Sequence, residues 1–270
     1  MLTPQADPLA FIDIGVNLTN SRFDKDRLQV INQAREAGVV AQIITGTNAQ
    51  ESQQAFELAR KHNGLFATAG CHPHDAQRMT IEDFEIIKSL QNQPEVVAIG
   101  ECGLDFNRNF SPPDSQQQVF RQQLELACVL QQPLFLHERD ASETMLAMLD
   151  EFEGKLPKAV IHCFTGSESE LMAYLERDLY IGITGWICDE RRGKPLADIV
   201  HLIPDDKLMI ETDAPYLIPR DIKPKPKSSR NLPQYLPHIA NKIAQCRSQS
   251  WEHIATISSQ NAKGFFQLSF

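Results

Sequence analysis

The stretch Val96–Asp105, VVAIGECGLD, decides the fold of this chain. Its four leading apolar residues, VVAI, are typical of a strand that is buried within a parallel sheet. The run ends abruptly in a carboxylate, Glu101, and the glycines at positions 100 and 103 predict tight backbone turns on either side of it. A single acid in this position usually ends a strand and points into water, so one occurrence predicts no site.

The same pattern recurs along the chain. Four further apolar runs end in an aspartate or a histidine: AFID at Asp13, PLFLH at His137, AVIH at His162 and LMIETD at Asp213. In parallel sheets the carboxyl ends of the strands lie at one edge, where functional groups gather. Five runs that end in this way predict a shared site at one end of a sheet.

Strands and helices alternate strictly in the predicted order of elements. Such alternation implies a parallel sheet, and eight units in about 250 residues have the size of a (β/α)8 barrel, also called a TIM barrel. A doubly wound open sheet is the alternative, but it explains the polar strand ends less well. No internal repeat or second domain is visible, so we expect one domain over residues 1–270.

The expected strands cover residues 11–15, 39–45, 65–69, 96–105, 134–136, 159–161, 179–183 and 208–211. The expected helices cover residues 24–37, 49–61, 80–90, 114–130, 141–152, 167–177, 192–202, 236–246, 251–259 and 261–268.

Charge and cysteine content limit the possible functions. The net charge is −9, which argues against binding to nucleic acid through general positive charge, so an anionic substrate must be met locally. The six cysteines have no CxxC spacing and indicate reduced thiols. No export signal or membrane-spanning run is apparent, and no exposed apolar helix stripe stands out. We expect a soluble, cytoplasmic monomer.

Four residues form the strongest candidate site. Glu101, His137, His162 and Asp213 would converge at the mouth of a barrel from strands four, five, six and eight. Two imidazoles and two carboxylates are a reasonable ligand set for a divalent metal ion. A carboxylate such as Glu101 can also bridge two ions about 3.5–4 Å apart.

Seven segments carry a resemblance that extends over nearly the whole chain, from DIGVNL at Asp13 to the last helix. They are ITGTN at Ile44, AGCHPHD at Ala69, IGECGLDF at Ile99, LHERDA at Leu136, IHCFTG at Ile161, IGITGW at Ile181 and ETDAPYL at Glu211. Together they resemble the TatD family of metal-dependent nucleases, within the amidohydrolase-like barrels. The resemblance implies a magnesium-dependent 3′-to-5′ exonuclease acting on single-stranded DNA and RNA, in DNA repair or degradation.

The resemblance also implies roles for individual residues. By the motif match, Glu101, His137 and His162 are metal ligands. Asp213 matches the aspartate of strand eight, which binds metal and orients or deprotonates the attacking water. Glu101 and Asp213 are therefore also expected to be catalytic.

One departure from the family pattern concerns strand one. Many members have His-x-His there, whereas this chain has Gly15 and Asn17. Asp13 and Asn17 can still offer oxygen ligands, so we expect one firm metal site and a second that is weak or completed by a substrate phosphate. Magnesium tolerates such a site. Two histidines are unusual company for magnesium, and manganese and zinc stay open as alternatives.

Histidines and basic residues are candidates for substrate contacts. His72 and His74 can protonate the leaving 3′ oxygen, or they can bind phosphate or hold the Pro73 turn. Arg139 can clamp a phosphate bidentately or form an ion pair with Asp140 or Asp105.

The loop 220–230, RDIKPKPKSSR, carries five bases and one acid and follows strand eight. We interpret it, through Arg220 and Lys225, as a contact to the nucleic-acid backbone; a solvated loop is the alternative. Trp186 and Phe106 either stack on bases or are buried in the rim.

Two rival functions stay open. The same barrel can hydrolyse a small ester or amide with its metal, although the missing histidines and the basic loop disfavour this. A non-catalytic, metal-stabilised barrel that binds nucleic acid is the other alternative.

Overall fold

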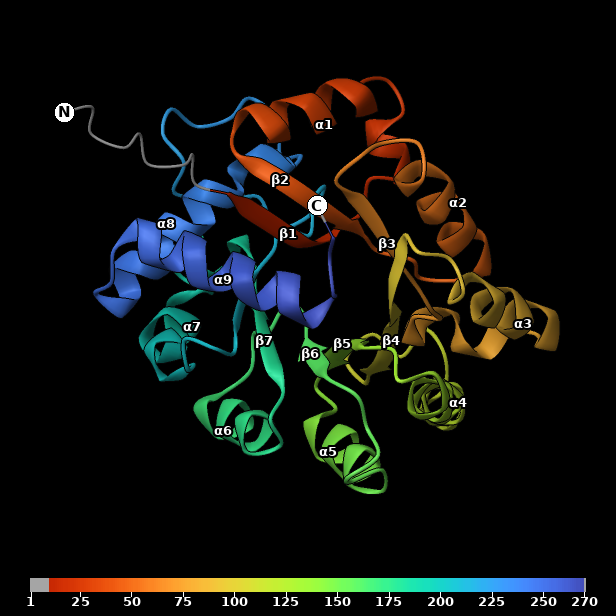
Figure 1. Cartoon of the computed structure of the whole chain (residues 1–270). Helices are drawn as coiled ribbons and strands as arrows, with labels where there is room; N and C mark the ends of the chain where they lie inside the picture. The colour runs from red at the N-terminus through yellow and green to blue at the C-terminus, as the bar shows by residue number, and fades with distance from the viewer. Residues whose placement is uncertain (1–9, 270) are drawn as a thin grey trace.

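The computed structural model describes residues 10–269, which form a barrel of eight parallel strands. The strands pair in sequence order from β1 to β8, and every pair along this order is parallel. Figure 1 shows the helices arranged around the strands, with α9 lying across one end of the barrel. The predicted (β/α)8 barrel is thus confirmed.

The bounds of the elements agree with the sequence prediction to within a few residues. The strands are β1 (Phe11–Val16), β2 (Val39–Ile44), β3 (Leu65–Ala69), β4 (Val96–Asp105), β5 (Leu134–Arg139), β6 (Ala159–Ile161), β7 (Tyr180–Ile183) and β8 (Leu208–Ile210). The helices are α1 (Arg27–Glu36), α2 (Ala49–Ala59), α3 (Ile81–Leu90), α4 (Pro113–Leu130), α5 (Ser142–Asp150), α6 (Glu168–Glu176), α7 (Lys194–Ile199), α8 (Leu236–Arg247) and α9 (Trp251–Phe265). Short 3-10 turns include η2 (Pro73–Arg78) and η3 (Gly185–Cys188).

Hydrogen bonds just beyond the ends of β1 and β8 draw the first and last strands together. The backbone N–H of Asp213 donates to the carbonyl of Gly15 at 2.9 Å, and that of Asn17 donates to the carbonyl of Ala214 at 2.8 Å. These bonds join the first and last strands at the carboxyl end of the barrel. Residues that follow β8 are therefore held beside those that end β1.

Helix α9 corrects one prediction. The sequence suggested two helices, 251–259 and 261–268, whereas the structure has one continuous helix, Trp251–Phe265. Asn261 lies inside it and donates from Nδ2 to the carbonyls of Asp205 and Leu208, both at 2.8 Å. This tertiary contact fixes a polar stretch that has weak helix propensity by itself. Apolar residues of the last turns then pack on the barrel interior: Ala262, Phe265, Phe266 and Leu268.

The glycines of β4 also act differently from the prediction. Instead of turning the chain on either side of Glu101, they let the strand continue to Asp105, with a register shift against β5 between Ile99 and Cys102. Gly100 and Gly103 have φ of +139° and +140°, and a Cβ on either would overlap a carbonyl of β5. They allow close approach between two strands, so Glu101 lies within β4.

Two findings bear on the expected cellular environment. The six cysteines all lie in the described part of the chain and are free, as predicted for reduced thiols. Among the helices of residues 10–269, none has the length and apolar character needed to span a bilayer.

The close approach at β4 generates a stability prediction. Gly103→Ala should lower the free energy of unfolding by about 2 kcal/mol or more, because the new methyl group meets the His137 carbonyl and the backbone keeps a positive φ. Gly264→Ala is the matched control: its Cβ would meet no atom within 4 Å, and alanine favours helix by roughly 0.5–1 kcal/mol. Urea unfolding of both variants measures the difference, and equal stabilities would contradict the close-approach argument.

Candidate functional site

A cavity of about 600 Å³ opens at the carboxyl ends of the strands. Eight of the predicted site residues line it: Asn17, His72, His74, Glu101, His137, Arg139, His162 and Asp213. Three do not line it: Asp13, Arg220 and Lys225. The structure therefore brings most of the predicted residues together, from segments that are far apart in the sequence.

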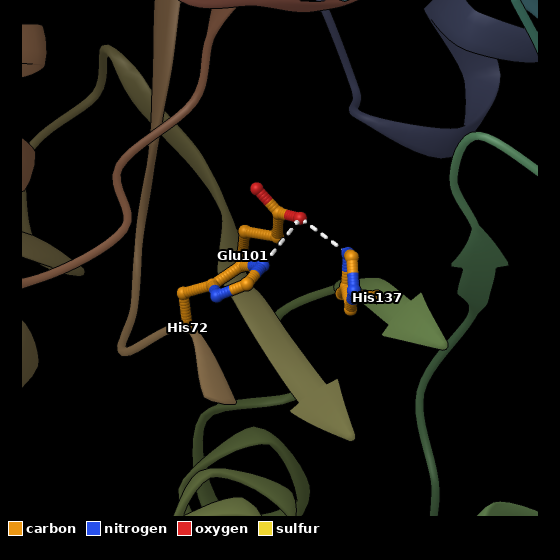
Figure 2. Close-up of side chains that lie close together, drawn as sticks. All are labelled: His72, Glu101 and His137. Atoms are coloured by element: carbon orange, nitrogen blue, oxygen red, sulfur yellow. Dashed lines mark hydrogen bonds and ion pairs between the residues drawn. The ribbon is translucent and has the colours of Figure 1, made fainter. Parts of the chain in front are cut away.

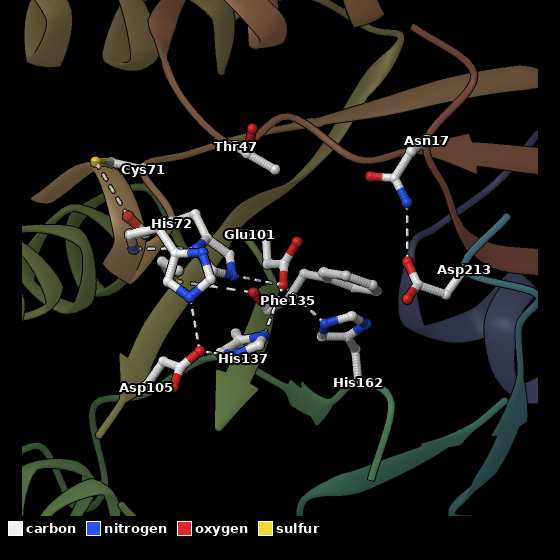
Figure 3. Close-up of polar contacts among 12 residues, drawn as sticks. Asn17, Thr47, Cys71, His72, Glu101, Asp105, Phe135, His137, His162 and Asp213 are labelled. Carbon is white, nitrogen blue, oxygen red and sulfur yellow. Dashed lines mark hydrogen bonds and ion pairs between the residues drawn. The ribbon is translucent and has the colours of Figure 1, made fainter. Parts of the chain in front are cut away.

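The centre of the cavity is one carboxylate oxygen surrounded by three imidazoles. Oε1 of Glu101 lies 2.8 Å from Nε2 of His162, 2.9 Å from Nδ1 of His137 and 3.3 Å from Nε2 of His72. Figure 2 shows His72 and His137 on either side of the acid, and Figure 3 adds His162 between Glu101 and Asp213. All three histidines approach the same oxygen, so we call these four residues the central cluster.

Strand register brings the central cluster together. The β4–β5 pairing matches Gly103 with His137, so the bulge of β4 places Glu101 beside the imidazole of its neighbouring strand. Strand β5 is longer than predicted and includes His137. His162 directly follows the short strand β6, and its backbone N–H still donates to the carbonyl of Leu136 at 2.9 Å. The parallel pairing of β4, β5 and β6 therefore sets the distances between Glu101, His137 and His162.

The electrostatics of the central cluster require positive charge. Burial raises the pKa of Glu101, but the charge of His162 and the hydrogen bonds from His137 and His162 outweigh burial and hold that pKa well below its usual range. Burial lowers the pKa of His162, but the carboxylates of Glu101 and Glu211 outweigh it and hold that pKa well above its usual range. A proton on His162 thus offsets only part of the negative charge of the two carboxylates that face it.

The donor set fits a divalent metal ion, which would supply the same positive charge. Ligand atoms of His72, Glu101 and His137 lie within 4.8 Å of one another. Nε2 of His137 is buried, and its recorded acceptor, Oδ2 of Asp105, is 3.5 Å away, which is too far for a good hydrogen bond. Nδ1 of His162 lies 3.2 Å from Oε2 of Glu211, the arrangement that in metal proteins fixes the tautomer and points the other nitrogen at the ion.

Glu211 is a site residue that the sequence analysis missed. It is fully buried, and its second oxygen accepts the backbone N–H of Cys163 at 2.5 Å. A Cβ on Gly15 would overlap Oε2 of Glu211, and a Cβ on Gly182 would lie 2.6 Å from Oε1. The missing histidine at position 15 therefore leaves space for this carboxylate. The available signal was an acid directly after an apolar run, two residues before Asp213.

Asp213 faces the central cluster from the segment after β8. Its Oδ1 accepts a hydrogen bond from Nδ2 of Asn17 at 2.8 Å, so Asn17 positions Asp213, while its role as an oxygen ligand stays a prediction. Burial and the nearby carboxylates of Glu101 and Glu211 raise the pKa of Asp213 to about 7, although His162 opposes them. A carboxylate with such a pKa can accept a proton near neutral pH.

His72 is held as a neutral hydrogen-bond donor. Burial lowers the pKa of His72 to about 4, and its Nδ1 accepts the backbone N–H of His74 at 3.1 Å. The proton of the neutral ring therefore sits on Nε2, which faces the cavity centre. His74 lies beside it, with Nε2 at 2.6 Å from Oδ2 of Asp105 and its ring 4.7 Å from that of Phe110.

Asp13 does not join the central cluster. Its Oδ1 accepts the backbone N–H of Thr212 at 2.9 Å, and its Oδ2 accepts the Thr212 hydroxyl at 2.5 Å. The N–H of Gly15 adds a third bond to Oδ1 at 3.3 Å. The side chain of Asp13 thus ties β1 to the segment after β8 and completes the junction of the first and last strands.

Two arginines give the cavity its positive charge. Arg108 and Arg139 both line it, and neither guanidinium has an ion-pair partner within 4.0 Å in residues 10–269. The alternative ion pair of Arg139 with Asp140 or Asp105 is therefore not formed. Both side chains are exposed and available to an anionic ligand.

The basic loop 220–230 is tied to the barrel at both ends. Arg220 pairs with Asp189 at 3.2 Å, and Arg230 pairs with Asp26 at 2.6 Å. Lys225 is exposed and lies outside the cavity lining. The terminal arginines thus stabilise the loop, and its lysines remain on the surface.

Exposed aromatic rings lie at other places than predicted. Phe110 is 62% exposed and Tyr216 is 48% exposed, and both line the cavity. The ring of Trp186 also reaches the cavity but is covered by the guanidinium of Arg192 at 4.5 Å. Phe106 packs partly buried against the core. The sequence signal for the exposed pair was an aromatic residue in a loop after a strand.

Comparison with known proteins identifies the class of this barrel. The chain belongs to the family of TatD-related DNases, whose family model matches residues 12–267. A protein of Salmonella typhimurium named "3'-5' ssDNA/RNA exonuclease TatD" is 53% identical over 258 residues, which cover 96% of this chain and 99% of that protein. A protein of the same name from Escherichia coli is 52% identical with the same coverage.

Solved structures agree with this assignment. A TatD homologue from Escherichia coli superposes with a TM-score of 0.87 at 26% identity, covering 96% of this chain and 98% of that one. A TatD-family hydrolase from Entamoeba histolytica gives a TM-score of 0.85 at 25% identity, covering 96% and 99%. An uncharacterised amidohydrolase from Saccharomyces cerevisiae, at 21% identity and a TM-score of 0.83, shares the fold.

The contacts of Asp13 generate a prediction for stability against pH. Burial raises the pKa of Asp13 to about 8, above the roughly 3.9 of an unfolded chain. The native state therefore binds this proton more tightly than the unfolded state, so the stabilisation is complete below about pH 4 and is lost as pH rises towards 8. Asp13→Asn lacks this group. Urea unfolding in EDTA should show wild type losing stability relative to Asp13→Asn over this range, and a constant difference would refute the expectation.

Proposed function

We propose that this protein is a divalent-metal-dependent nuclease that removes nucleotides from the 3′ ends of single-stranded DNA and RNA. The observation that carries the proposal is the convergence of three imidazoles on Oε1 of Glu101, with Asp213 across the same cavity. The names of the relatives support the polarity and the substrate.

Glu101, His137 and His162 would hold the firm metal ion, together with Asp213, which lines the same cavity. When bound, a divalent ion supplies Lewis acidity towards a phosphate oxygen and a nearby water. Magnesium is the proposed ion because it prefers the carboxylate oxygens of the site and of the substrate phosphate. Manganese and zinc are alternatives because they also accept the two histidine nitrogens as ligands. A second, weaker site would be completed by the substrate phosphate.

Protein groups divide the remaining work in the cavity. Asp213, held by Asn17, accepts a proton from the attacking water. Neutral His72 donates a hydrogen bond from Nε2 to a phosphate oxygen. This role suits it better than that of a general acid, because loss of its only ring proton would leave an imidazolate. Of the roles considered for His72, its geometry supports phosphate binding through Nε2 and holding the Pro73 turn through Nδ1, and it disfavours the general acid.

Substrate contacts extend from the metal to the rim. Arg108 and Arg139 provide bidentate donors for phosphates next to the scissile one. Phe110 and Tyr216 offer exposed ring faces for terminal bases. Lys225 would contact the strand farther out through charge alone. Such a protein would act as a single-domain, monomeric cytoplasmic enzyme in DNA repair or degradation.

Metal removal and loss of Asp213 test the activity directly. EDTA should stop the shortening of a 5′-labelled single-stranded oligonucleotide, and Asp213→Asn should slow it by about 100-fold or more, as expected for loss of a general base. Asp140→Asn is the matched control, because Asp140 is exposed and bonds Asn107 outside the central cluster. We expect this variant to retain wild-type activity in the same magnesium buffer.

The same assay separates the rival functions. Full activity of pure Asp213→Asn would sink the assignment. Turnover of phosphate-free esters or amides, without any cleavage of oligonucleotides, would show a small-molecule hydrolase. Tight oligonucleotide binding without cleavage in magnesium, manganese and zinc would show a binding protein.

The exposed rings generate a separate prediction. Phe110→Ala and Tyr216→Ala should each raise the KM for oligonucleotides by about 5- to 150-fold, because stacking is worth roughly 1–3 kcal/mol per base. Tyr216→Phe is the matched control, since it keeps the ring and loses only the hydroxyl, which accepts a bond from Asn20. An unchanged KM in both alanine variants would remove these rings from the proposed substrate path.

A further inference from the structure

A second group of potential metal ligands lies outside the cavity. Cys188 ends η3, Asp221 lies in the basic loop and His238 is on α8. One ligand atom from each lies within 4.8 Å of the others. None of the three lines the cavity of the central cluster. Three segments of different kinds thus meet at one point on the barrel wall.

The chemistry of this group differs from that of the central cluster. Asp221 and His238 are already in contact, because Oδ1 of Asp221 is 2.7 Å from Nε2 of His238, and the Cys188 sulfur lies within 4.8 Å of both ligand atoms. Thiolate, imidazole and carboxylate are the ligands of zinc and related transition metals, whereas magnesium avoids sulfur. Tetrahedral zinc separates such ligands by about 3.3–3.6 Å, so small side-chain movements would suffice.

The three residues of this group differ in their exposure to solvent. Cys188 is 1% exposed, whereas the side chains of Asp221 and His238 are 26% and 33% exposed. The sulfur therefore lies at the bottom of the group, and solvent reaches the other two ligands. This leaves a position for a fourth ligand, such as water, and a path of entry for the ion.

We propose that Cys188, Asp221 and His238 form a second metal site, specific for zinc-like ions, which fastens the basic loop to the barrel wall. As the metal–sulfur bond forms, the Cys188 proton passes to solvent. His238 binds through Nε2, so the ring proton that Nε2 shares with Asp221 is released as Nδ1 takes up a proton, and His238 stays a neutral ligand. The site does not depend on the proposed nuclease activity, because it contains no residue of the central cluster.

The position of Asp221 gives this site a structural consequence. The loop is already held at its ends by Arg220 with Asp189 and by Arg230 with Asp26. A metal bound to Asp221 would replace its 2.7 Å contact with His238 by bonds that link the loop to both α8 and η3, directly before the exposed lysines 223, 225 and 227. Occupancy would therefore restrict the part of the loop that carries its unpaired positive charge.

Cobalt titration of the full chain tests the ligand set, because a Co²⁺–thiolate bond gives a near-ultraviolet charge-transfer band. The central cluster contains no sulfur ligand, so the band reports the second site alone. We expect the band in wild type and in Glu101→Gln. We expect Cys188→Ser to abolish it, and His238→Gln to weaken Co²⁺ binding at this site by more than the roughly 10- to 100-fold cost of losing an outer partner.

Thiol variants control for the other cysteines. Cys163 lines the central cavity, and Cys246 lies near Cys188, so Cys163→Ser and Cys246→Ser should both keep the band. A band lost in Cys163→Ser, or no band in wild type, would overturn the proposal. His238→Gln keeps the test decisive if Cys188→Ser fails to fold.

Limited trypsin digestion tests the attachment of the loop. Pro224 and Pro226 protect the bonds after Lys223 and Lys225, so cleavage in the lysine stretch falls after Lys227. Zn²⁺ should slow this cleavage in wild type, and Cys188→Ser and His238→Gln should lose the protection at the same Zn²⁺ concentration. Equal cleavage rates with and without Zn²⁺ in wild type would contradict the proposed attachment.

Discussion

A buried carboxylate that requires positive charge organises the active end of this barrel. Glu101 is 7% exposed, and no apolar environment would tolerate its charge alone. Three imidazoles surround one of its oxygens, and Glu211 adds a second buried carboxylate behind His162. Protons can balance this charge, and a divalent cation balances it better because it needs no raised pKa. The affinity for a cation thus follows from the desolvation of two acids.

Small residues make this arrangement sterically possible. Gly100 and Gly103 let β4 approach β5 closely enough for Glu101 to reach His137. Gly15 and Gly182 leave the volume that the Glu211 carboxylate occupies. A histidine at position 15 would compete with Glu211 for this space. The absence of a side chain at Gly15 and the presence of the buried Glu211 carboxylate therefore depend on each other, because both concern the same volume.

Several ionisable residues that were candidates for the site stabilise the fold. Asp13 ties the first strand to Thr212, and Arg220 and Arg230 attach the basic loop to acids on the barrel. The guanidinium charges of Arg220 and Arg230 are paired with these acids, whereas Arg108 and Arg139 line the cavity without an ion pair among the described residues. Both guanidinium groups therefore lie where an anionic ligand would enter the cavity.

Strand–helix alternation and the ends of apolar runs are local patterns that can be recognised without a structure. They were therefore enough to predict the barrel and four strand-end residues of the site: Glu101, His137, His162 and Asp213. The sequence could not show that Asp13 contacts Thr212 and not the central cluster, since an acid at the end of a buried strand can point to either side of the strand. Two contacts became visible only in the folded barrel: Glu211 occupies the space beside Gly15, and Asn17 donates a hydrogen bond to Asp213. These roles depend on which side chains compete for the same volume and the same hydrogen bonds, and that competition exists only once the strands have closed into a barrel.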